Sequence, residues 1–236
     1  MCGSLATVEW LGQLYAVDSS VKILLTHNCS DLSPPLPHRK SMSNSEFQIE
    51  YLKLSGAAVI SPPVYRDQRG YFSVPFNRDT LKTGGITADF IQDNQSLSEQ
   101  TGTIRGLHYQ LPPFEQAKLV RVLAGRILDV IVDARLGSPT FGQHYKTELS
   151  AQNAKQVFVP RGFLHGFITC EPNTIVMYKV DNDYSPGGDR SVRWDDPVLA
   201  IDWGLGGETP ALSDKDKNAQ SWDSFKALSL FKYKGF

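Results

Sequence analysis

Lys118-Leu-Val-Arg-Val-Leu-Ala-Gly-Arg-Ile-Leu-Asp-Val-Ile-Val-Asp133 is the stretch that decides the fold of this chain. Two apolar runs, 118–123 and 126–133, flank the pair Ala124-Gly125, which is typical of two strands joined by a tight turn. In the second run the odd-numbered residues share one face of a strand and the even-numbered residues share the other. The stretch therefore predicts a β-hairpin with one apolar face and one mixed face.

Short strands with frequent turns continue on both sides of this stretch. Glycine or proline recurs at short intervals from Tyr51 onward, which is typical of an all-β sandwich or barrel. Residues 156–159 and 174–180 predict two further strands, with Pro160–Gly166 as the corner between them. The segment from Ser213 predicts a short helix. For a chain of 236 residues we expect one domain, spanning residues 46–236.

Residues 1–45 differ from the rest of the chain. Their apolar residues show poor periodicity and lead into a proline-rich and serine-rich stretch from Ser33 to Ser45. That composition suits a linker better than a packed element. We predict that residues 1–45 form a poorly structured N-terminal extension, and one hypothesis is that translation naturally begins at Met42.

Composition argues against several classes of protein. The 24 lysine and arginine residues are balanced by 25 aspartate and glutamate residues, so no basic surplus would attract nucleic acid or an anionic membrane. The longest apolar region, 119–132, is interrupted by Arg121, Arg126 and Asp129 and is too short to span a membrane. Three widely spaced cysteines fit a reducing compartment. We expect a cytoplasmic protein that binds neither nucleic acid nor membrane.

The predicted strand Thr103–Gln110 places an arginine, Arg105, beside a histidine, His108. A metal site is disfavoured, because the residue two positions after His108 is Gln110 and not a second histidine. The chain also lacks a serine-hydrolase elbow and the phosphate loops of nucleotide-binding folds. Metal-free proton transfer and plain ligand binding remain as the two interpretations.

Proton transfer beside a carbonyl needs a base and a cation for the enolate oxygen, and inversion also needs an acid on the opposite face. His108 is the natural base if a carboxylate orients its other ring nitrogen. Lys118, at the start of a strand, is a candidate cation, and Tyr184, at a loop entry, is a candidate acid. His165 is either a second donor or a satisfied core histidine.

Several motifs of the chain, taken in order, resemble those of one enzyme family, the dTDP-4-dehydrorhamnose 3,5-epimerases. This family inverts two centres that flank a ketone on a nucleotide-linked 6-deoxy sugar. The resemblance runs from about Gly56 to about Asp216. Its motifs are Asp67-Gln-Arg-Gly-Tyr-Phe72, Gln92-Asp-Asn94, Ile104-Arg-Gly-Leu-His-Tyr-Gln110, Gln116-Ala-Lys-Leu-Val-Arg121, Asp129-Val-Ile-Val-Asp133, Gly137-Ser-Pro-Thr-Phe-Gly142, Val159-Pro-Arg-Gly-Phe-Leu-His-Gly-Phe167, Tyr184-Ser-Pro186 and Trp194-Asp-Asp-Pro197.

The resemblance implies a cupin-type jelly roll with short peripheral helices, commonly a homodimer, that works without a metal or other cofactor. It casts His108 as the base, Tyr184 as the acid on the other face of the sugar and Lys118 as the group that stabilises the enolate oxygen. The motif Leu212-Ser-Asp-Lys-Asp216 implies that Asp216 is the partner of His108, with Asp214 as the alternative.

The resemblance also implies a set of residues that bind the sugar nucleotide, in which arginines act as forked donors to the diphosphate. One departure is Val74, where the family usually has an acidic residue that helps to bind the nucleotide. The implied substrate-binding residues are Arg69, which would reach the diphosphate from its own or a partner subunit, and Phe72, Gln92, Asn94, Arg105 and His165.

The implied reaction converts dTDP-4-dehydro-6-deoxy-D-glucose into dTDP-4-dehydro-L-rhamnose by epimerisation at C3 and C5. Two alternatives stay open. One is an epimerase that acts at C3 or C5 only, on a related dTDP-4-keto sugar, and the other is a cupin that binds a sugar nucleotide without turnover.

Overall fold

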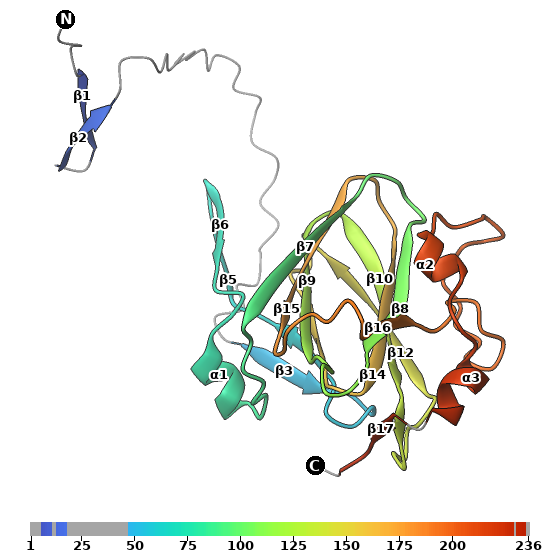
Figure 1. Ribbon diagram of the computed structural model, residues 1–236. Coiled ribbons are helices and arrows are strands. Elements are labelled where there is room, and N and C mark those ends of the chain that lie inside the picture. The colour runs from blue at the N-terminus through green and yellow to red at the C-terminus, as the bar shows by residue number, and fades with distance from the viewer. Residues whose placement is uncertain (1–5, 11–12, 18–46, 229, 235–236) are drawn as a thin grey trace, which may run out of the picture. The chain divides into compact units, whose positions relative to one another are not determined.

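The computed structural model describes residues 6–10, 13–17, 47–228 and 230–234 (Figure 1). The chain divides into two compact units, Met1–Lys40 and Ser41–Phe236. In the first unit, β1 (Ala6–Trp10) pairs antiparallel with β2 (Gln13–Val17). The other residues of the predicted N-terminal extension, including Met42, lie outside the described residues, so the extension stays a prediction.

The second unit is built from two antiparallel sheets. The six-stranded sheet has the order β3-β4-β13-β9-β15-β7, and the five-stranded sheet has the order β12-β10-β14-β8-β16. The strands of the first are β3 (Gln48–Tyr51), β4 (Ala58–Ser61), β13 (Gln156–Val159), β9 (Lys118–Ala124), β15 (Thr174–Val180) and β7 (Gln92–Ser98). Those of the second are β12 (His144–Ser150), β10 (Arg126–Asp133), β14 (Phe163–Thr169), β8 (Ile104–Gln110) and β16 (Asp189–Ser191).

Smaller elements surround the two sheets. An exposed hairpin, β5 (Val64–Asp67) with β6 (Gly70–Ser73), projects from the second unit (Figure 1). A parallel pair joins β11 (Arg135–Leu136) to β17 (Phe231–Lys232). The helices are α1 (Arg78–Thr83), α2 (Asp214–Lys217) and α3 (Trp222–Ala227). The prediction of an all-β jelly roll with short peripheral helices is confirmed, and so is the short helix after Ser213.

The main core lies between the two sheets. Val120 and Val122 of β9 and Ile127 and Ile131 of β10 belong to one buried cluster together with residues of β13, β14 and β15. Full burial of one such side chain stabilises the fold by about 1.5–3 kcal/mol. Strand alternation points one side of each strand into this core, so polar residues on the same side also point between the sheets.

Each sheet also has a covered outer face. Ile104, Leu107 and Tyr109 of β8 pack outward against Trp222 and other apolar residues of the C-terminal segment. On the other sheet, Leu119 and Phe158 pack with residues on and beside α1. Because both faces of the central strands are buried, these strands read as nearly continuous apolar runs in the sequence.

The predicted hairpin of residues 118–133 is wrong. β9 and β10 belong to different sheets: β9 pairs with β13 and β15, whereas β10 pairs with β12 and β14. The turn at Gly125, which has a φ of 76°, carries the chain from one sheet to the other. The two strands face each other across the core. The sequence pattern of a short turn between two apolar runs cannot distinguish these arrangements. The same pattern occurs in a hairpin within one sheet and in a connection between two sheets.

The two strands predicted at residues 156–159 and 174–180 are confirmed as β13 and β15. The predicted corner between them, Pro160–Gly166, is shorter than expected. Strand β14 begins at Phe163 and every one of its residues is buried. His165 therefore lies within a central strand and not in a turn. The glycine at 166 suggested a turn, whereas its role is to admit a neighbouring strand at close range.

That neighbouring strand is β8, which carries a β-bulge at Gly106. His165 of β14 pairs with His108 and Phe167 pairs with Arg105, so two residues of β8 face Gly166 alone. The extra residue places Arg105 and His108, three positions apart, on the same inner face. Arg105 accordingly bonds to Ser98 of the opposite sheet, while Leu107 points outward.

Among the residues that the structure describes, no helix is both long enough and apolar enough to cross a membrane.

The bulge gives a first prediction. A Cβ atom on Gly106 would lie 2.5 Å from the Cα atom of Gly166, at a φ of 136°. We expect Gly106→Ala to lower the free energy of unfolding by about 3 kcal/mol or more, because backbone strain and a backbone clash add together. Urea denaturation measures the loss.

The matched control is Gly70→Ala. Gly70 has a φ of 134°, but nothing lies within 4 Å of its added Cβ. This variant carries the backbone cost alone, about 1–3 kcal/mol. Equal losses in the two variants would show that the close approach to Gly166 is unimportant.

Candidate active site

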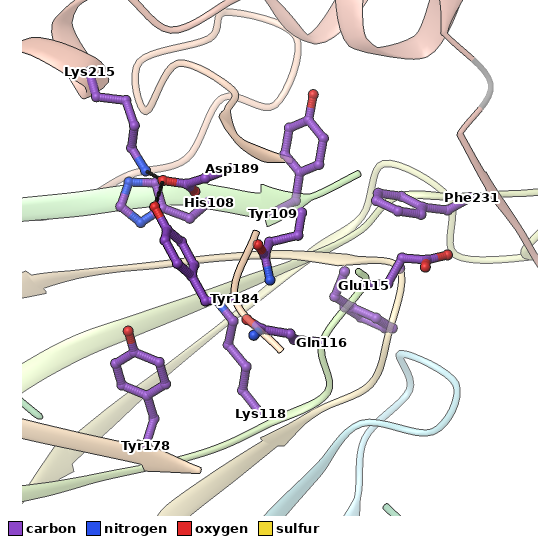
Figure 2. Close-up of a pocket in the computed structure, with 13 residues that line it drawn as sticks. His108, Tyr109, Glu115, Gln116, Lys118, Tyr178, Tyr184, Asp189, Lys215 and Phe231 are labelled. Atoms are coloured by element: carbon purple, nitrogen blue, oxygen red, sulfur yellow. Dashed lines mark hydrogen bonds and ion pairs between the residues drawn. The ribbon is translucent and has the colours of Figure 1, made fainter. Parts of the chain in front are cut away.

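A cavity of about 230 Å³ opens between the two sheets (Figure 2). His108 of β8 reaches it from the five-stranded sheet, and Lys118 of β9 and Tyr178 of β15 reach it from the six-stranded sheet. Tyr184 and Lys215 line it from outside the two sheets, on the loop before β16 and on α2. The cavity thus brings together a histidine, the phenols of Tyr178 and Tyr184 and the ammonium groups of Lys118 and Lys215, and Tyr109 also lines it.

His108 is held by a buried carboxylate. Its Nε2 atom lies 2.6 Å from Oδ1 of Asp216, whose side chain is 2% exposed. Asp216 sits in the first turn of α2, where Ser213 caps the helix and donates a hydrogen bond to Oδ2 at 2.9 Å. Asp214, the alternative partner, is exposed and pairs with Lys217. The structure places Asp216, and not Asp214, against His108.

Electrostatics decide which group carries the proton. Burial raises the pKa of Asp216, but the hydrogen bonds from His108 and Ser213 outweigh it and bring the pKa below its ordinary value. Burial lowers the pKa of His108, and the hydrogen bond with Asp216 offsets this only in part. At neutral pH the imidazole is therefore neutral and donates from Nε2 to the carboxylate. Its other nitrogen is left free to accept a proton.

Lys118 supplies a cation on the opposite wall of the cavity. Burial lowers its pKa to about 8, while the negative charges of Asp189 and Asp129 oppose the shift. The ammonium group lies 5.7 Å from the centre of the Tyr178 ring. Lys118 thus remains mostly charged at neutral pH, but its pKa is close enough to the working range to respond to neighbouring charges.

Tyr178 is a pocket residue that sequence reasoning missed. It shares the inner face of β15 with the buried Val176 and Val180. Burial raises the pKa of its phenol, so the hydroxyl stays protonated. The alternation of β15 could have indicated its inward direction, but not that it would meet His108 across the cavity.

Tyr184 lies at the mouth of the cavity and is 55% exposed. Its hydroxyl donates to Oδ2 of Asp189 at 3.3 Å, and Nζ of Lys215 donates to the same oxygen at 2.8 Å (Figure 2). The negative charge of Asp189 raises the pKa of Tyr184. Sequence reasoning also missed Asp189 and Lys215, although Lys215 lies within the motif that predicted Asp216.

His165 does not line the cavity. It is 6% exposed, and its Nε2 atom lies 2.8 Å from Oδ2 of Asp129. The structure shows a buried histidine with a carboxylate partner, and its role as a substrate-binding residue stays a prediction. It nevertheless lies beside the site, because it pairs with His108 across the β8–β14 ladder.

The other predicted substrate-binding residues lie outside the cavity. Arg105 donates to the side chain of Ser98 and to the backbone of Leu97, on the inner side of β7. Gln92 and Asn94, also on β7, bond to each other at 2.7 Å.

Arg69 and Phe72 lie on the projecting β5–β6 hairpin. The guanidinium of Arg69 pairs with Asp67 and its side chain is 86% exposed. Phe72 is 65% exposed and stacks on Tyr65. Neither residue lines the cavity of its own chain.

Within the described part of the chain, no three histidine, cysteine, aspartate or glutamate residues are grouped so that they could hold a metal ion.

Comparison with known proteins identifies the family. The model of the dTDP-4-dehydrorhamnose 3,5-epimerase family matches residues 51–224. The chain belongs to this family. The dTDP-4-dehydrorhamnose 3,5-epimerase of Sinorhizobium fredii is 44% identical over 176 residues, which cover 75% of this chain and 90% of that protein. The protein is thus an isomerase of the epimerase type.

Solved structures of the family share the cupin jelly roll of this chain. A dTDP-6-deoxy-D-glucose-3,5-epimerase from Legionella pneumophila, in complex with dTDP-4-keto-L-rhamnose, matches with a TM-score of 0.76 and 42% identity, covering 80% of this chain and 100% of that chain. A double variant of a 3′-monoepimerase from Streptomyces bikiniensis, with histidine replaced by asparagine and tyrosine by phenylalanine, was solved in complex with dTDP. It matches with a TM-score of 0.73 and 30% identity, covering 78% and 93% of the two chains.

The contact between His108 and Asp216 gives a second prediction. In an NMR titration of the imidazole protons, we expect the midpoint of His108 to lie below 6.5. Asp216→Asn removes the hydrogen bond and the charge that raise this pKa, so the midpoint should fall further. Asp214→Asn, on the same helix, should leave the midpoint unchanged. A shift of the same size in both variants would contradict the assigned contact.

Proposed function

We propose that this epimerase converts dTDP-4-dehydro-6-deoxy-D-glucose into dTDP-4-dehydro-L-rhamnose by inverting C3 and C5, in a reaction that needs no cofactor. One observation carries the proposal. A neutral, carboxylate-bound histidine faces a lysine and a phenol across one cavity between the sheets. These three groups can take a proton from a carbon beside a ketone, hold the resulting enolate and return a proton to the other face.

His108 is the base in this proposal. Its free ring nitrogen takes the proton from C3 or C5, and the electron pair of the broken C–H bond moves into the ring to form the enolate on the 4-keto oxygen. Asp216 holds the imidazole and stabilises the positive charge that it gains. Lys118 donates to the enolate oxygen, where an ammonium group in a low-dielectric site is most effective.

Two phenols are candidates for the acid, and geometry favours Tyr178 over Tyr184. Tyr178 projects from the sheet opposite His108 and is partly buried, so a sugar ring between them is flanked on both faces. Tyr184 is exposed and its hydroxyl is engaged by Asp189.

A relative supports the same choice. The histidine and tyrosine replaced in the Streptomyces bikiniensis 3′-monoepimerase are as far apart in that chain as His108 and Tyr178 are in this one. The sequence-based assignment of Tyr184 as the acid is untested. We favour Tyr178 as the acid and propose that Tyr184 contacts the substrate at the mouth of the cavity.

The remaining polar residues are proposed to bind the sugar nucleotide. Lys215 lies at the cavity mouth, where its ammonium group can exchange Asp189 for a phosphate oxygen. Arg105 and His165 lie on β8 and β14, the first on the strand of His108 and the second paired with it, whereas Gln92 and Asn94 lie on the edge strand β7.

Arg69 and Phe72 are exposed on their hairpin and do not reach the cavity of their own chain, which supports a homodimer in which a partner subunit supplies them. We place this reaction in the cytoplasm, in accord with the widely spaced cysteines.

The first test follows deuterium by proton NMR. Protein in D2O is incubated with dTDP-4-dehydro-6-deoxy-D-glucose, and we expect deuterium to enter at both C3 and C5. His108→Asn should lower the exchange rate at least about a hundredfold, since a general base contributes about 10²–10⁴-fold. Binding of dTDP should change only a few fold.

Each other outcome is informative. Exchange at one carbon only would indicate a single-site epimerase, and binding without exchange would indicate a non-catalytic cupin. Near-normal exchange in His108→Asn would overturn the mechanism.

A matched pair of variants identifies the acid. We expect Tyr178→Phe to reduce inversion more than it reduces deuterium exchange, because proton removal by His108 survives without the acid. Tyr184→Phe should mainly weaken substrate binding. Chiral analysis of the product alongside the exchange rate measures both effects. The reverse pattern would assign the acid to Tyr184.

A further inference from the structure

Among the residues that the structure describes, Asp129 is a buried acid whose hydrogen bonding is incomplete. Its side chain is 1% exposed, and His165 bonds to its Oδ2 atom at 2.8 Å. Among the described residues, its Oδ1 atom is the only buried side-chain nitrogen or oxygen without a hydrogen-bond partner. An unsatisfied charged oxygen away from water costs several kcal/mol, so such an atom signals a missing donor.

The position of Asp129 shows where that donor can come from. Asp129 lies on the same side of β10 as Ile127 and Ile131, which belong to the core between the sheets. Its carboxylate therefore faces the inner side of the six-stranded sheet and not the outer cover of its own sheet.

Lys118 is the complementary group on that opposite sheet. Its ammonium group has three donors, and within the described part of the chain it forms no hydrogen bond and no ion pair. Its one charge-specific contact is with the ring of Tyr178. The negative charge of Asp129 also acts on Lys118 strongly enough to raise its pKa. Oδ1 of Asp129, which lacks a donor, and the ammonium group of Lys118, which lacks an acceptor, thus both lie in the interior between the two sheets.

We propose that Asp129 is a positioning residue, whose Oδ1 atom receives the ammonium group of Lys118 while its Oδ2 atom holds His165. This proposal rests on the proposed function of Lys118 at the enolate oxygen. One N–H of the ammonium group points to Asp129 and leaves the other two for the substrate. Asp129 thereby keeps Lys118 charged and aimed at the ketone without touching the substrate itself.

Several other charges act on Lys118, and the test must separate them from Asp129. They come from the strands and the helix around the cavity. They are Asp189 of β16, which favours the charged form, Lys215 of α2, which disfavours it, and His108 of β8, which becomes positive when it is protonated. The phenols of Tyr178 and Tyr184 line the same cavity. None of these groups is altered by a substitution of Asp129.

The primary test is an NMR titration that needs no substrate. Protein labelled with ¹³C at the lysine ε-carbons is titrated, and the Lys118 signal is identified by its absence in Lys118→Met. In the unaltered protein we expect a midpoint of about 8. Asp129→Asn is nearly isosteric but uncharged, and it should lower the midpoint by about one unit or more.

His165→Leu is the matched control. It removes the hydrogen bond to Oδ2 but keeps the charge of Asp129, so the midpoint of Lys118 should stay within a few tenths of a unit of about 8. An unchanged midpoint in Asp129→Asn overturns the proposal. An equal fall in both variants also overturns it, because the effect would then run through His165 or through general disturbance of the core.

A kinetic readout links the proposal to the reaction. In Asp129→Asn the basic limb of the pH profile for deuterium exchange should move to lower pH together with the Lys118 midpoint. We expect kcat to fall at least tenfold while KM changes less than about threefold, since Asp129 does not contact the substrate. If the unaltered protein exchanges no protons, the proposed function fails, but the lysine titration still decides the role of Asp129.

If Asp129→Asn fails to fold, a crystal structure of the unaltered protein with a bound sugar nucleotide decides instead. We expect Nζ of Lys118 within about 3.2 Å of Oδ1 of Asp129. A different donor at Oδ1, with Lys118 elsewhere, would overturn the proposal.

Discussion

The close approach of two glycine backbones, Gly106 and Gly166, is the constraint on which the site depends. A Cβ atom at either position would press into the neighbouring strand. This contact admits the β-bulge in β8, and the bulge turns both Arg105 and His108 toward the interior. Without it, strict alternation would send one of them to the outer face, where Leu107 and Tyr109 pack in the apolar cover. A local backbone irregularity thus creates the polar interior of an otherwise apolar barrel.

The C-terminal segment has two roles that share one physical cause. Trp222 and Phe225 of α3 cover the outer face of the five-stranded sheet with large apolar surface. The same segment carries α2, whose first turn presents Asp216 to His108. Packing of the cover therefore positions the carboxylate that orients the imidazole. Stability and site geometry are coupled, because the energy of burying the cover also holds the helix that the site requires.

Burial and nearby carboxylates have opposite effects on the pKa values of the basic residues in the interior of the barrel. Burial lowers the pKa of both His108 and Lys118, which leaves the first neutral and the second close to its titration range. Carboxylates placed one by one around the cavity then set which groups keep their protons. Asp216 acts on His108, and Asp189 and Asp129 act on Lys118. Acid–base chemistry at neutral pH needs this kind of tuning, because ordinary histidine and lysine differ too much in pKa to work as a pair.

Sequence by itself determined the elements and the list of chemical groups. Alternating apolar runs and frequent glycine and proline predicted an all-β sandwich or barrel, and the motif order pointed to the family and to His108, Lys118 and Asp216. The tertiary structure alone decided which strands pair: residues 118–133 proved to be two strands of opposite sheets, because a turn does not specify which partner each strand finds. It also decided which side chains meet. Tyr178 lies 70 residues after His108, and Asp129, although only eleven residues after Lys118, lies on the opposite sheet. Only the packing of the two sheets brings these side chains to one cavity and one interior.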